Sequence, residues 1–206
     1  MQLTEELKQF YEIKKCEIKQ RLYEFKNVSP EDYFYELCFC ICTPQSKASS
    51  ALQVQQILMS ENFFYKEFDP TPILRESKRY IRFHNTKAAR LLSARKFYPK
   101  IQEVLNTGLS NIEKRNWLAD NFNGFGYKES AHFLRNIGYE NLGILDRHIL
   151  RHLVSCGVFE EIPKIGTKNG YLKVEKEFLN FADFIGIPMD ELDLLFWAFS
   201  TGEIIK

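Results

Sequence analysis

The amino-acid sequence predicts an all-α fold, and three observations lead to this prediction. Apolar residues recur at helical spacing through nearly every segment of the 206 residues. No segment shows the alternation of apolar and polar residues that marks a half-buried strand. Helix-starting residues precede the periodic segments, and glycine or proline follows them. Because a basic central segment has to pack against the flanking helices, we expect two helical lobes rather than a single bundle.

Four helix starts are expected in the N-terminal half of the chain. Thr4 is followed by two acids, which suits an N-cap and the positive end of a helix dipole. Proline favours the first helical position, so the proline after Ser29 indicates another start. The four expected starts lie at Thr4, Ser29-Pro30, Ala48 and Asn85. In the last of these helices, Pro99 is expected to cause a kink or a restart.

The C-terminal half contains a further series of helix signals. Ser110 and Glu113 have the spacing of a capping box, in which each side chain pairs with the backbone N–H of the other residue. Glycines follow several of the later periodic segments, and glycine commonly ends a helix. We expect these later helices at 127–137, 146–157, 171–185 and 190–201.

The composition excludes several classes of protein. The chain has 28 Lys and Arg against 27 Asp and Glu, so no overall charge excess indicates a partner. No apolar run reaches membrane-spanning length and no segment resembles a signal peptide, so we expect a cytoplasmic protein. None of the five cysteines lies in a CxxC pair, which gives no support to a zinc ribbon or an iron–sulfur cluster. We expect Cys38, Cys40 and Cys42, which lie in an apolar helical stretch, to be buried small apolar residues; a disulfide is the alternative for a hyperthermophile protein.

The basic residues are concentrated in one segment. Residues 75–100 contain nine Lys or Arg against one Glu, a local excess of eight positive charges, and aromatic residues lie between them. This segment, the basic stripe, could neutralise DNA phosphates. The expected phosphate contacts are Arg82, Lys87 and Arg90. A solvated helix face is the alternative interpretation of the same charges.

Two glycines separated by one residue, Gly124 and Gly126, lie between predicted helices. A tight turn there needs residues that tolerate a positive φ, and it lets the backbone approach a partner closely. The N–H groups at the start of the next helix would form a small anion site suited to a DNA phosphate. A Gly-x-Gly turn alone is a weak signal, because most are merely turns.

A lysine and an aspartate strengthen the signal. Lys128 follows Gly126 by two residues, and Asp146 follows Lys128 by eighteen, immediately before Arg147-His148-Ile149. This stretch resembles the helix-hairpin-helix DNA glycosylase superfamily, whose hairpin reads roughly Leu-Pro-Gly-Val-Gly-x-Lys and whose acid lies in a similar Asp-x-His-Ile context.

The resemblance has one local departure and several implications. At Phe122 and Asn123 the family usually has Leu-Pro. The family fold implies a single helix-hairpin-helix glycosylase unit over residues 1–206, with the hairpin motif at about 111–137. It also implies that the active site lies in the cleft between the two helical lobes.

Within the superfamily, the whole chain is similar to the second class of 8-oxoguanine DNA glycosylase/lyases, which is common in archaea. The matching stretches are Thr43–Ser46, Arg82–Ala88 and the C-terminus from Phe196-Trp197 to Ile205-Lys206. Endonuclease III usually carries a C-terminal cysteine cluster for a 4Fe–4S centre, and no cysteine here follows Cys156. The resemblance implies a monomer that excises 8-oxoguanine from double-stranded DNA on the nucleoid, without a cofactor, a metal or a membrane.

The resemblance also implies the roles of two residues. The damaged nucleotide has to leave the base stack before it can react. The amine of Lys128 would then displace the base at C1′, form a Schiff base and permit β-elimination. Asp146 would stabilise positive charge at C1′ and also cap the following helix. An exposed surface lysine and a purely capping aspartate are the alternatives.

Further residues are assigned to the base and to the DNA backbone. The expected base-recognition residues are Lys206, Trp197, Phe83 and His84. The expected DNA contacts outside the basic stripe are Gly124, Gly126, Gln45, Ser46 and His148. Simple helix capping for Gln45 and Ser46, and a frayed terminus for Lys206, are the alternatives. His148 and His152 have a spacing that can hold zinc, but no third ligand is evident.

Two other functions remain compatible with the pattern. A thymine-glycol-type or broad-specificity glycosylase/lyase would share Lys128 and Asp146 but would need a different base pocket. A non-catalytic helix-hairpin-helix DNA-binding module would not require a lysine and an aspartate at this spacing.

Overall fold

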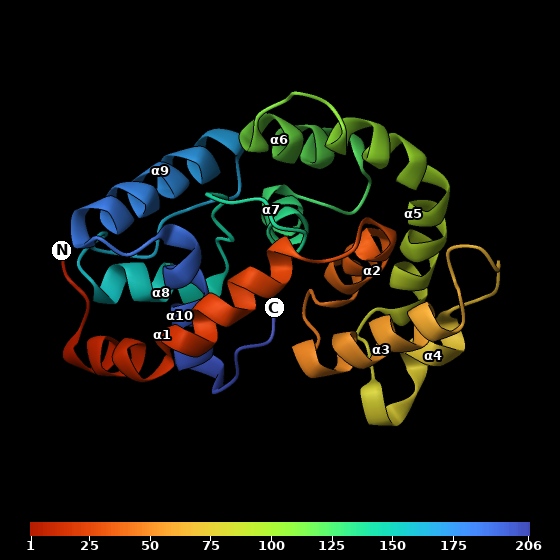
Figure 1. Cartoon of the computed structure of the whole chain (residues 1–206), viewed down its shortest axis with the longest axis horizontal. Helices are drawn as coiled ribbons and strands as arrows, with labels where there is room; N and C mark the ends of the chain where they lie inside the picture. Colours follow the sequence, from red (N-terminus) through yellow and green to blue (C-terminus); the bar gives the residue numbers. More distant parts are fainter. The chain divides into compact units, whose positions relative to one another are not determined.

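The computed structural model describes all 206 residues and consists of helices and connecting loops, without strands (Figure 1). The predicted all-α class is therefore confirmed. The α-helices are α1 (Glu5–Lys26), α2 (Tyr33–Cys42), α3 (Ala48–Ser60), α4 (Thr71–Arg75), α5 (His84–Leu105), α6 (Asn111–Asn121), α7 (Tyr127–Asn136), α8 (Arg147–Ser155), α9 (Lys168–Ile185) and α10 (Met189–Thr201). Two 3-10 helices, η1 (Pro30–Asp32) and η2 (Ser77–Arg79), complete the structure. None of the helices has the length and apolar character needed to cross a membrane.

The chain divides into two compact units, as the expectation of two helical lobes requires. Unit 1 comprises residues 1–27 and 138–206, and unit 2 comprises residues 28–137. The first unit therefore joins the N-terminal helix to the C-terminal third of the chain, while the second is continuous.

Helix α10 forms the centre of unit 1. It packs against α1, α8 and α9. Phe196 of α10 is fully buried and stacks on Phe178 of α9 and on His152 of α8. At the exposed end of α10, Phe199 meets the edge of Phe10 on α1. These aromatic contacts join all four helices of the unit around one apolar strip. Removing this apolar surface from water stabilises the unit by about 25 cal/mol per Å².

Helix α2 plays the same part in unit 2. It packs against α3, α5 and α7, and every residue after Tyr33 is buried. Phe34 contacts Tyr98 of α5 at a ring separation of 5.3 Å. The three cysteines of α2 and Cys156 are buried, Cys16 is exposed, and none of the five forms a disulfide. The prediction of buried small apolar residues is thus confirmed for Cys38, Cys40 and Cys42.

Local capping signals were predicted with mixed success. Thr4 caps α1 and Ser110 forms the expected capping box with Glu113. Asn85 does not cap α5, because the helix begins one residue earlier, at His84, after a left-handed Phe83. Pro99 does not end the helix, which continues to Leu105. Pro99 is exposed and its neighbours Tyr98 and Ile101 are buried, so packing outweighs the lost backbone hydrogen bond.

Candidate active site

The hairpin that carries Lys128 is formed by α6, the loop 122–126 and α7. Phe122 and Phe125 are buried in this loop, with ring centroids 5.0 Å apart, and Phe122 also stacks on Phe97 of α5. Phe125 N–H donates to the carbonyl of Phe122, which closes the turn. The phenylalanine at the position of the usual leucine therefore supplies the apolar anchor of the loop.

Only one of the two hairpin glycines has a positive φ, the conformation that favours glycine over other residues. Gly124 has φ +103°, and a Cβ there would lie 2.8 Å from the Cδ and Nε atoms of Arg90. Gly126 has φ −102°, an extended conformation that any residue adopts. The expectation of a positive φ is thus confirmed for Gly124 and is wrong for Gly126. The close approach at Gly124 places Arg90, a residue of the basic stripe, directly against the hairpin.

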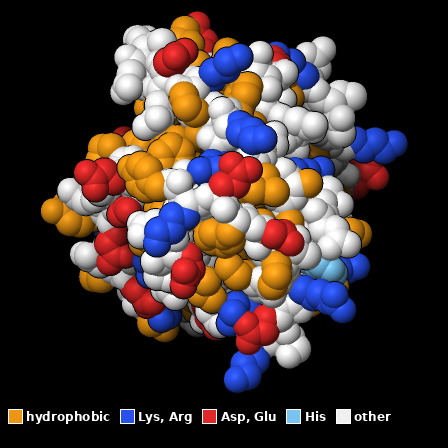
Figure 2. Space-filling view, turned by 90° about the vertical axis from the view of Figure 1, so that its right-hand side faces the viewer, with side chains coloured by type: hydrophobic (Ala, Val, Ile, Leu, Met, Phe, Trp, Pro, Cys, Tyr) orange, Lys and Arg blue, Asp and Glu red, His pale blue; other side chains and the backbone are white.

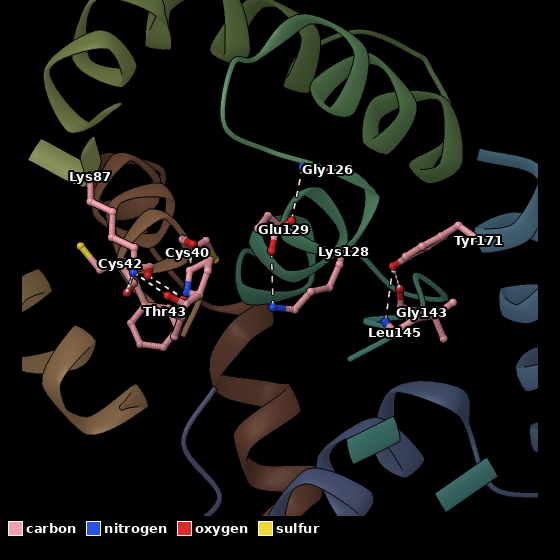
Figure 3. Close-up of polar contacts among 12 residues, drawn as sticks. Cys40, Cys42, Thr43, Lys87, Gly126, Lys128, Glu129, Gly143, Leu145 and Tyr171 are labelled. Carbon is pink, nitrogen blue, oxygen red and sulfur yellow. Dashed lines mark hydrogen bonds and ion pairs between the residues drawn. The ribbon is translucent and has the colours of Figure 1, made fainter. Parts of the chain in front are cut away.

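Lys128 is the second residue of α7, and its side chain is 29% exposed. Its Nζ lies 3.4 Å from Oε1 of Glu129, while Oε2 of Glu129 accepts a hydrogen bond of 3.3 Å from Gly126 N–H (Figure 3). No side chain caps the start of α7, since Gly126 has none. The start of this helix therefore combines a partly exposed amine with backbone N–H groups that no N-cap side chain occupies.

Lys87 does not lie on the exposed side of the basic stripe, contrary to our expectation. Its side chain is buried, and Nζ donates to the carbonyl of Cys42 (2.7 Å), the carbonyl of Pro44 (2.6 Å) and Oγ of Ser46 (3.2 Å). An ammonium whose three protons are used inside the protein has none left for a phosphate. Lys87 is therefore removed from the predicted DNA contacts.

The cations around Lys87 are close enough to affect one another. Burial, together with the positive charges of Arg90, Lys128 and Arg82, lowers the pKa of Lys87 to about 8. The side chains of α5 and the start of α7 thus produce a local positive field in unit 2, which attracts anions.

The rest of the basic stripe is less uniform than its sequence suggests. Arg79 pairs with Glu76, and Arg95 pairs with Glu67 and donates to the carbonyls of Phe64 and Tyr65. On the face drawn in Figure 2, basic and acidic side chains are interspersed among apolar ones. The stripe is therefore not one basic face, and Arg82 and Arg90 are the expected phosphate contacts that remain.

Asp146 is the N-cap of α8 in unit 1. A single oxygen, Oδ1, accepts hydrogen bonds from His148 N–H (2.7 Å) and Ile149 N–H (2.9 Å). Oδ2 accepts no hydrogen bond. The sequence predicts that Asp146 caps the helix, but not that a single oxygen does so. Oδ1 holds the carboxylate in place, and Oδ2 is available to a ligand.

Side chains of α9 hold the buried segment before Asp146. Tyr171 OH donates to the carbonyl of Gly143 at 2.5 Å and lies 3.4 Å from Leu145 N, which donates to it. Glu175 accepts a 2.9 Å hydrogen bond from Gly143 N–H. Figure 3 shows the Tyr171 side chain reaching both Gly143 and Leu145. Sequence reasoning missed Tyr171 and Glu175, because nothing in the sequence pairs them with a segment more than 25 residues away.

The remaining expected residues of unit 1 lie on α8, α10 and the C-terminal tail. Trp197 is half-buried on α10. Nε2 of His152 lies 2.8 Å from Ser200 Oγ, and burial lowers the pKa of His152. The tail is held against α1, where Arg21 donates to the carbonyl of Ile204 (3.4 Å), and Lys206 at its end is half-buried.

The remaining expected residues of unit 2 lie in two loops. Gln45 and Phe83 are exposed and have positive φ angles of 57° and 59°. Ser46 Oγ accepts a hydrogen bond of 3.0 Å from Arg82 N–H. The ring of His84 meets the edge of Tyr80. Gln45 and Phe83 are therefore exposed residues with an unfavourable backbone conformation, and Ser46 links their two loops through Arg82 N–H and Lys87.

Comparison with known proteins gives one consistent result. A family model described as Ogg-HhH, 8-oxoguanine DNA glycosylase, matches residues 18–187. The chain is 40% identical over 211 residues to an 8-oxoguanine DNA glycosylase/AP lyase of Fusobacterium nucleatum, covering 98% of this chain and 96% of the relative. It is 34% identical over 209 residues to that of Methanocaldococcus jannaschii, covering 97% and 99%. The crystal structure of the Methanocaldococcus jannaschii 8-oxoguanine glycosylase/lyase with a 15mer DNA containing 8-oxoguanine has a TM-score of 0.85 at 32% identity, covering 98% of this chain and all of that one.

Proposed function

The chain belongs to the 8-oxoguanine DNA glycosylase family, and we propose that it excises 8-oxoguanine from double-stranded DNA through Lys128 and then cleaves the strand as an AP lyase. The observation that carries the catalytic assignment is the Lys128 amine, which is partly exposed at the start of the hairpin helix and has Glu129 as its polar neighbour. A nucleophilic amine has to be accessible to the sugar, and a lysine satisfied inside the protein, such as Lys87, could not take this role.

The proposed chemistry has two stages, excision of the base and cleavage of the strand. The Nζ atom of Lys128, after losing a proton, attacks C1′ of the extruded nucleotide. The bond from C1′ to the base breaks, and the released base takes up a proton. Loss of a proton from nitrogen and opening of the sugar ring give a Schiff base. Removal of a C2′ proton then expels the 3′ phosphate by β-elimination, and water releases Lys128 from the sugar fragment.

Asp146 is proposed to assist this reaction through its second carboxylate oxygen. Because Oδ1 is held by two backbone N–H groups, the charge of the group is fixed in position. Oδ2 can then stabilise positive charge at C1′ as the base departs, an electrostatic effect that fixed charges perform efficiently.

The DNA contacts follow from the positive field around the hairpin. We assign phosphate contacts to Arg82, Arg90, the N–H group of Gly124 and those in the first turn of α7, with His148 as a further backbone contact. The N–H groups of Phe125 and Gly126 already donate to the Phe122 carbonyl and to Glu129, so Gly126 serves only to let the backbone approach the DNA. Gln45 and Ser46 are assigned to the site of the flipped nucleotide. The protein is proposed to act as a monomer.

Base recognition is assigned to the aromatic residues and the C-terminus. 8-Oxoguanine has an N7–H donor where guanine has an acceptor, so a discriminating pocket needs an acceptor. An acceptor left unpaired against guanine costs about 1–3 kcal/mol. Lys206, through its carboxylate or backbone, is proposed to contribute to base recognition. Trp197 is a proposed stacking face, and Phe83 or His84 is its counterpart. Deleting Lys206 should reduce the excision ratio of 8-oxoguanine to guanine while borohydride trapping at abasic DNA persists.

Borohydride trapping tests the function directly. The protein is incubated with duplexes that contain 8-oxoguanine, thymine glycol or uracil, and borohydride reduces any Schiff base to a stable adduct. We expect an adduct with 8-oxoguanine and none with undamaged DNA. An adduct with thymine glycol alone would replace the substrate assignment, and binding without any adduct would indicate a non-catalytic module.

A further inference from the structure

Two loops of unit 2 each present an exposed residue in an unfavourable backbone conformation. Gln45 has φ 57° and Phe83 has φ 59°, in the left-handed region that glycine normally occupies. Phe83 is 55% exposed, and Gln45 is also exposed. This conformation is unfavourable for a residue with a side chain, and it persists only where surrounding contacts hold it. Buried contacts next to the two residues should therefore explain why the strain is retained.

The Lys87 side chain supplies these contacts on the side of Gln45. It extends from α5 toward the C-terminal end of α2 at Cys42 (Figure 3). Its ammonium donates to the carbonyl of Pro44 and to the Oγ of Ser46, the two residues that flank Gln45. The left-handed residue is thus held on both sides by one cation.

Ser46 extends the same arrangement to the loop of Phe83. Its Oγ accepts a hydrogen bond of 3.0 Å from Arg82 N–H and one of 3.2 Å from Lys87 Nζ. Arg82 directly precedes Phe83, and its guanidinium carbon lies 5.6 Å from the centre of the Phe83 ring. Lys87 and Ser46 therefore form one polar connection between the two strained residues.

The position of Lys87 is costly for fold stability alone. Lys87 as a residue is 2% exposed, and the partners of its ammonium are neutral oxygens. Three further cations lie near it and help to lower its pKa to about 8. Burying a charge without a counter-charge is unfavourable, and an apolar side chain of similar length would fill the same space. An ammonium nevertheless offers three donors from one point, which the three acceptors around Lys87 require.

We propose that Lys87, acting through Ser46, is a positioning residue that holds Gln45 and Phe83 in the conformation in which they engage the DNA at the flipped nucleotide. This inference rests on the proposed function, and it assigns to Lys87 a role in shaping the DNA-reading loops instead of contacting phosphate. Lys128 lies outside the connection and performs the chemistry.

The test measures loop positioning without requiring base excision. A duplex carries 2-aminopurine opposite a stable abasic analogue, and its fluorescence rises when the protein alters stacking at the gap. The variants are Lys87→Met, Ser46→Ala and, as a matched control, Lys176→Met, which removes an exposed lysine of α9. Each is measured at saturating protein in the Lys128→Gln background, with a thermal melt to confirm folding.

We expect Lys87→Met to lose most of the fluorescence rise, and Ser46→Ala to lose part of it because two of the three Lys87 contacts remain. In the catalytic background, Lys87→Met should slow excision of 8-oxoguanine from duplex DNA by about ten- to a hundred-fold, the scale expected for misplaced contacts. Trapping at a ready-made abasic site should change by about three-fold at most, because Lys128 keeps its amine and loses only the repulsion of one neighbouring cation. Lys176→Met should match the unaltered protein throughout.

Three results would overturn the proposal. The first is an unchanged fluorescence rise in folded Lys87→Met. The second is an equal loss of excision and of trapping at the abasic site, which would mean that Lys87 supports Lys128 instead. The third applies if Lys87→Met fails to fold: a folded Ser46→Ala variant with the same fluorescence rise as the unaltered protein would show that Ser46 does not connect the two loops. Failure of the unaltered protein to excise 8-oxoguanine would instead contradict the proposed function, because the fluorescence does not depend on excision.

Discussion

The two helices that carry the proposed catalytic residues begin in opposite ways. The N-cap of helix α7 is Gly126, which has no side chain, and Lys128 lies in the first turn of the helix. The N-cap of helix α8 is Asp146, whose own carboxylate accepts two of the N–H groups there. The start of α7 can therefore receive an anion from outside, whereas the start of α8 is already satisfied by the residue proposed to act on the sugar.

The segments that lead into these helices are also held differently. The α7 hairpin closes on itself through Phe122 and Phe125, which are three residues apart. The segment before α8 depends on Tyr171 and Glu175, which come from another helix of the same unit. One catalytic residue is positioned by local contacts and the other by contacts distant in sequence, so the two should respond differently to mutation.

The largest effect is expected at the local site, from Lys128→Gln. Glutamine has no nucleophilic amine, so borohydride trapping and strand cleavage should fall at least about 1,000-fold. DNA binding should persist, because the phosphate contacts come from other groups. Gel trapping and fluorescence anisotropy measure the two effects separately. A variant that still forms the covalent adduct would remove Lys128 from the nucleophile role.

Asp146→Asn tests whether the α8 start is more than a cap. The amide oxygen keeps an acceptor for the two backbone N–H groups but carries no charge, so excision should fall about a hundred- to a thousand-fold while the melting temperature changes little. Asp146→Ala, the control, should also lose about 0.5–2 kcal/mol of stability. Near-normal turnover by the asparagine variant would leave Asp146 a structural cap.

Tyr171→Phe should produce a smaller loss, about ten-fold in kcat, by releasing the segment that carries Asp146. The variant lacks the donor to Gly143 and the acceptor from Leu145, at a cost of about 1 kcal/mol in stability. Glu175→Gln is the matched control, since an amide oxygen can still accept from Gly143 N–H. KM should be unchanged in both. A Tyr171→Phe variant that melts lower but turns over normally would show that the segment needs no support.

The contrast between the two helix starts also explains what could be predicted from sequence. Thr4, the Ser110–Glu113 capping box and the turn at Gly124 act over a few residues, and the sequence predicts them correctly. The start of α5 was misplaced because the left-handed Phe83 is maintained by contacts outside its own segment. Lys87 was misassigned for a similar reason: its charge suggested a surface position, but the acceptors that allow its burial come from residues 42–46.

The same reasoning applies to the active-site supports. A tyrosine and a glutamate on α9 have ordinary positions in an amphipathic helix, and nothing in their spacing identifies the backbone groups of residues 143–145 as their partners. Glu129, in contrast, could have been found, since it is the third residue of α7 and its carboxylate accepts from the N–H of the residue before the helix.

The smallest effect is expected in the salt dependence of DNA binding, and it tests whether the start of α7 receives a phosphate. Arg90 lies against Gly124 and contributes to the positive field there. If it shares a phosphate with the hairpin N–H groups, Arg90→Gln should lower the slope of log K against log salt by about 0.9, the value for one phosphate contact. Arg82→Gln should give a similar change.

Lys87→Met should leave the slope unaltered, because the Lys87 protons are already used inside the protein. Affinity for undamaged duplex is measured at several salt concentrations. An unchanged slope in Arg90→Gln would mean that the start of α7 does not bind the DNA backbone. A reduced slope in Lys87→Met would return that lysine to the phosphate contacts.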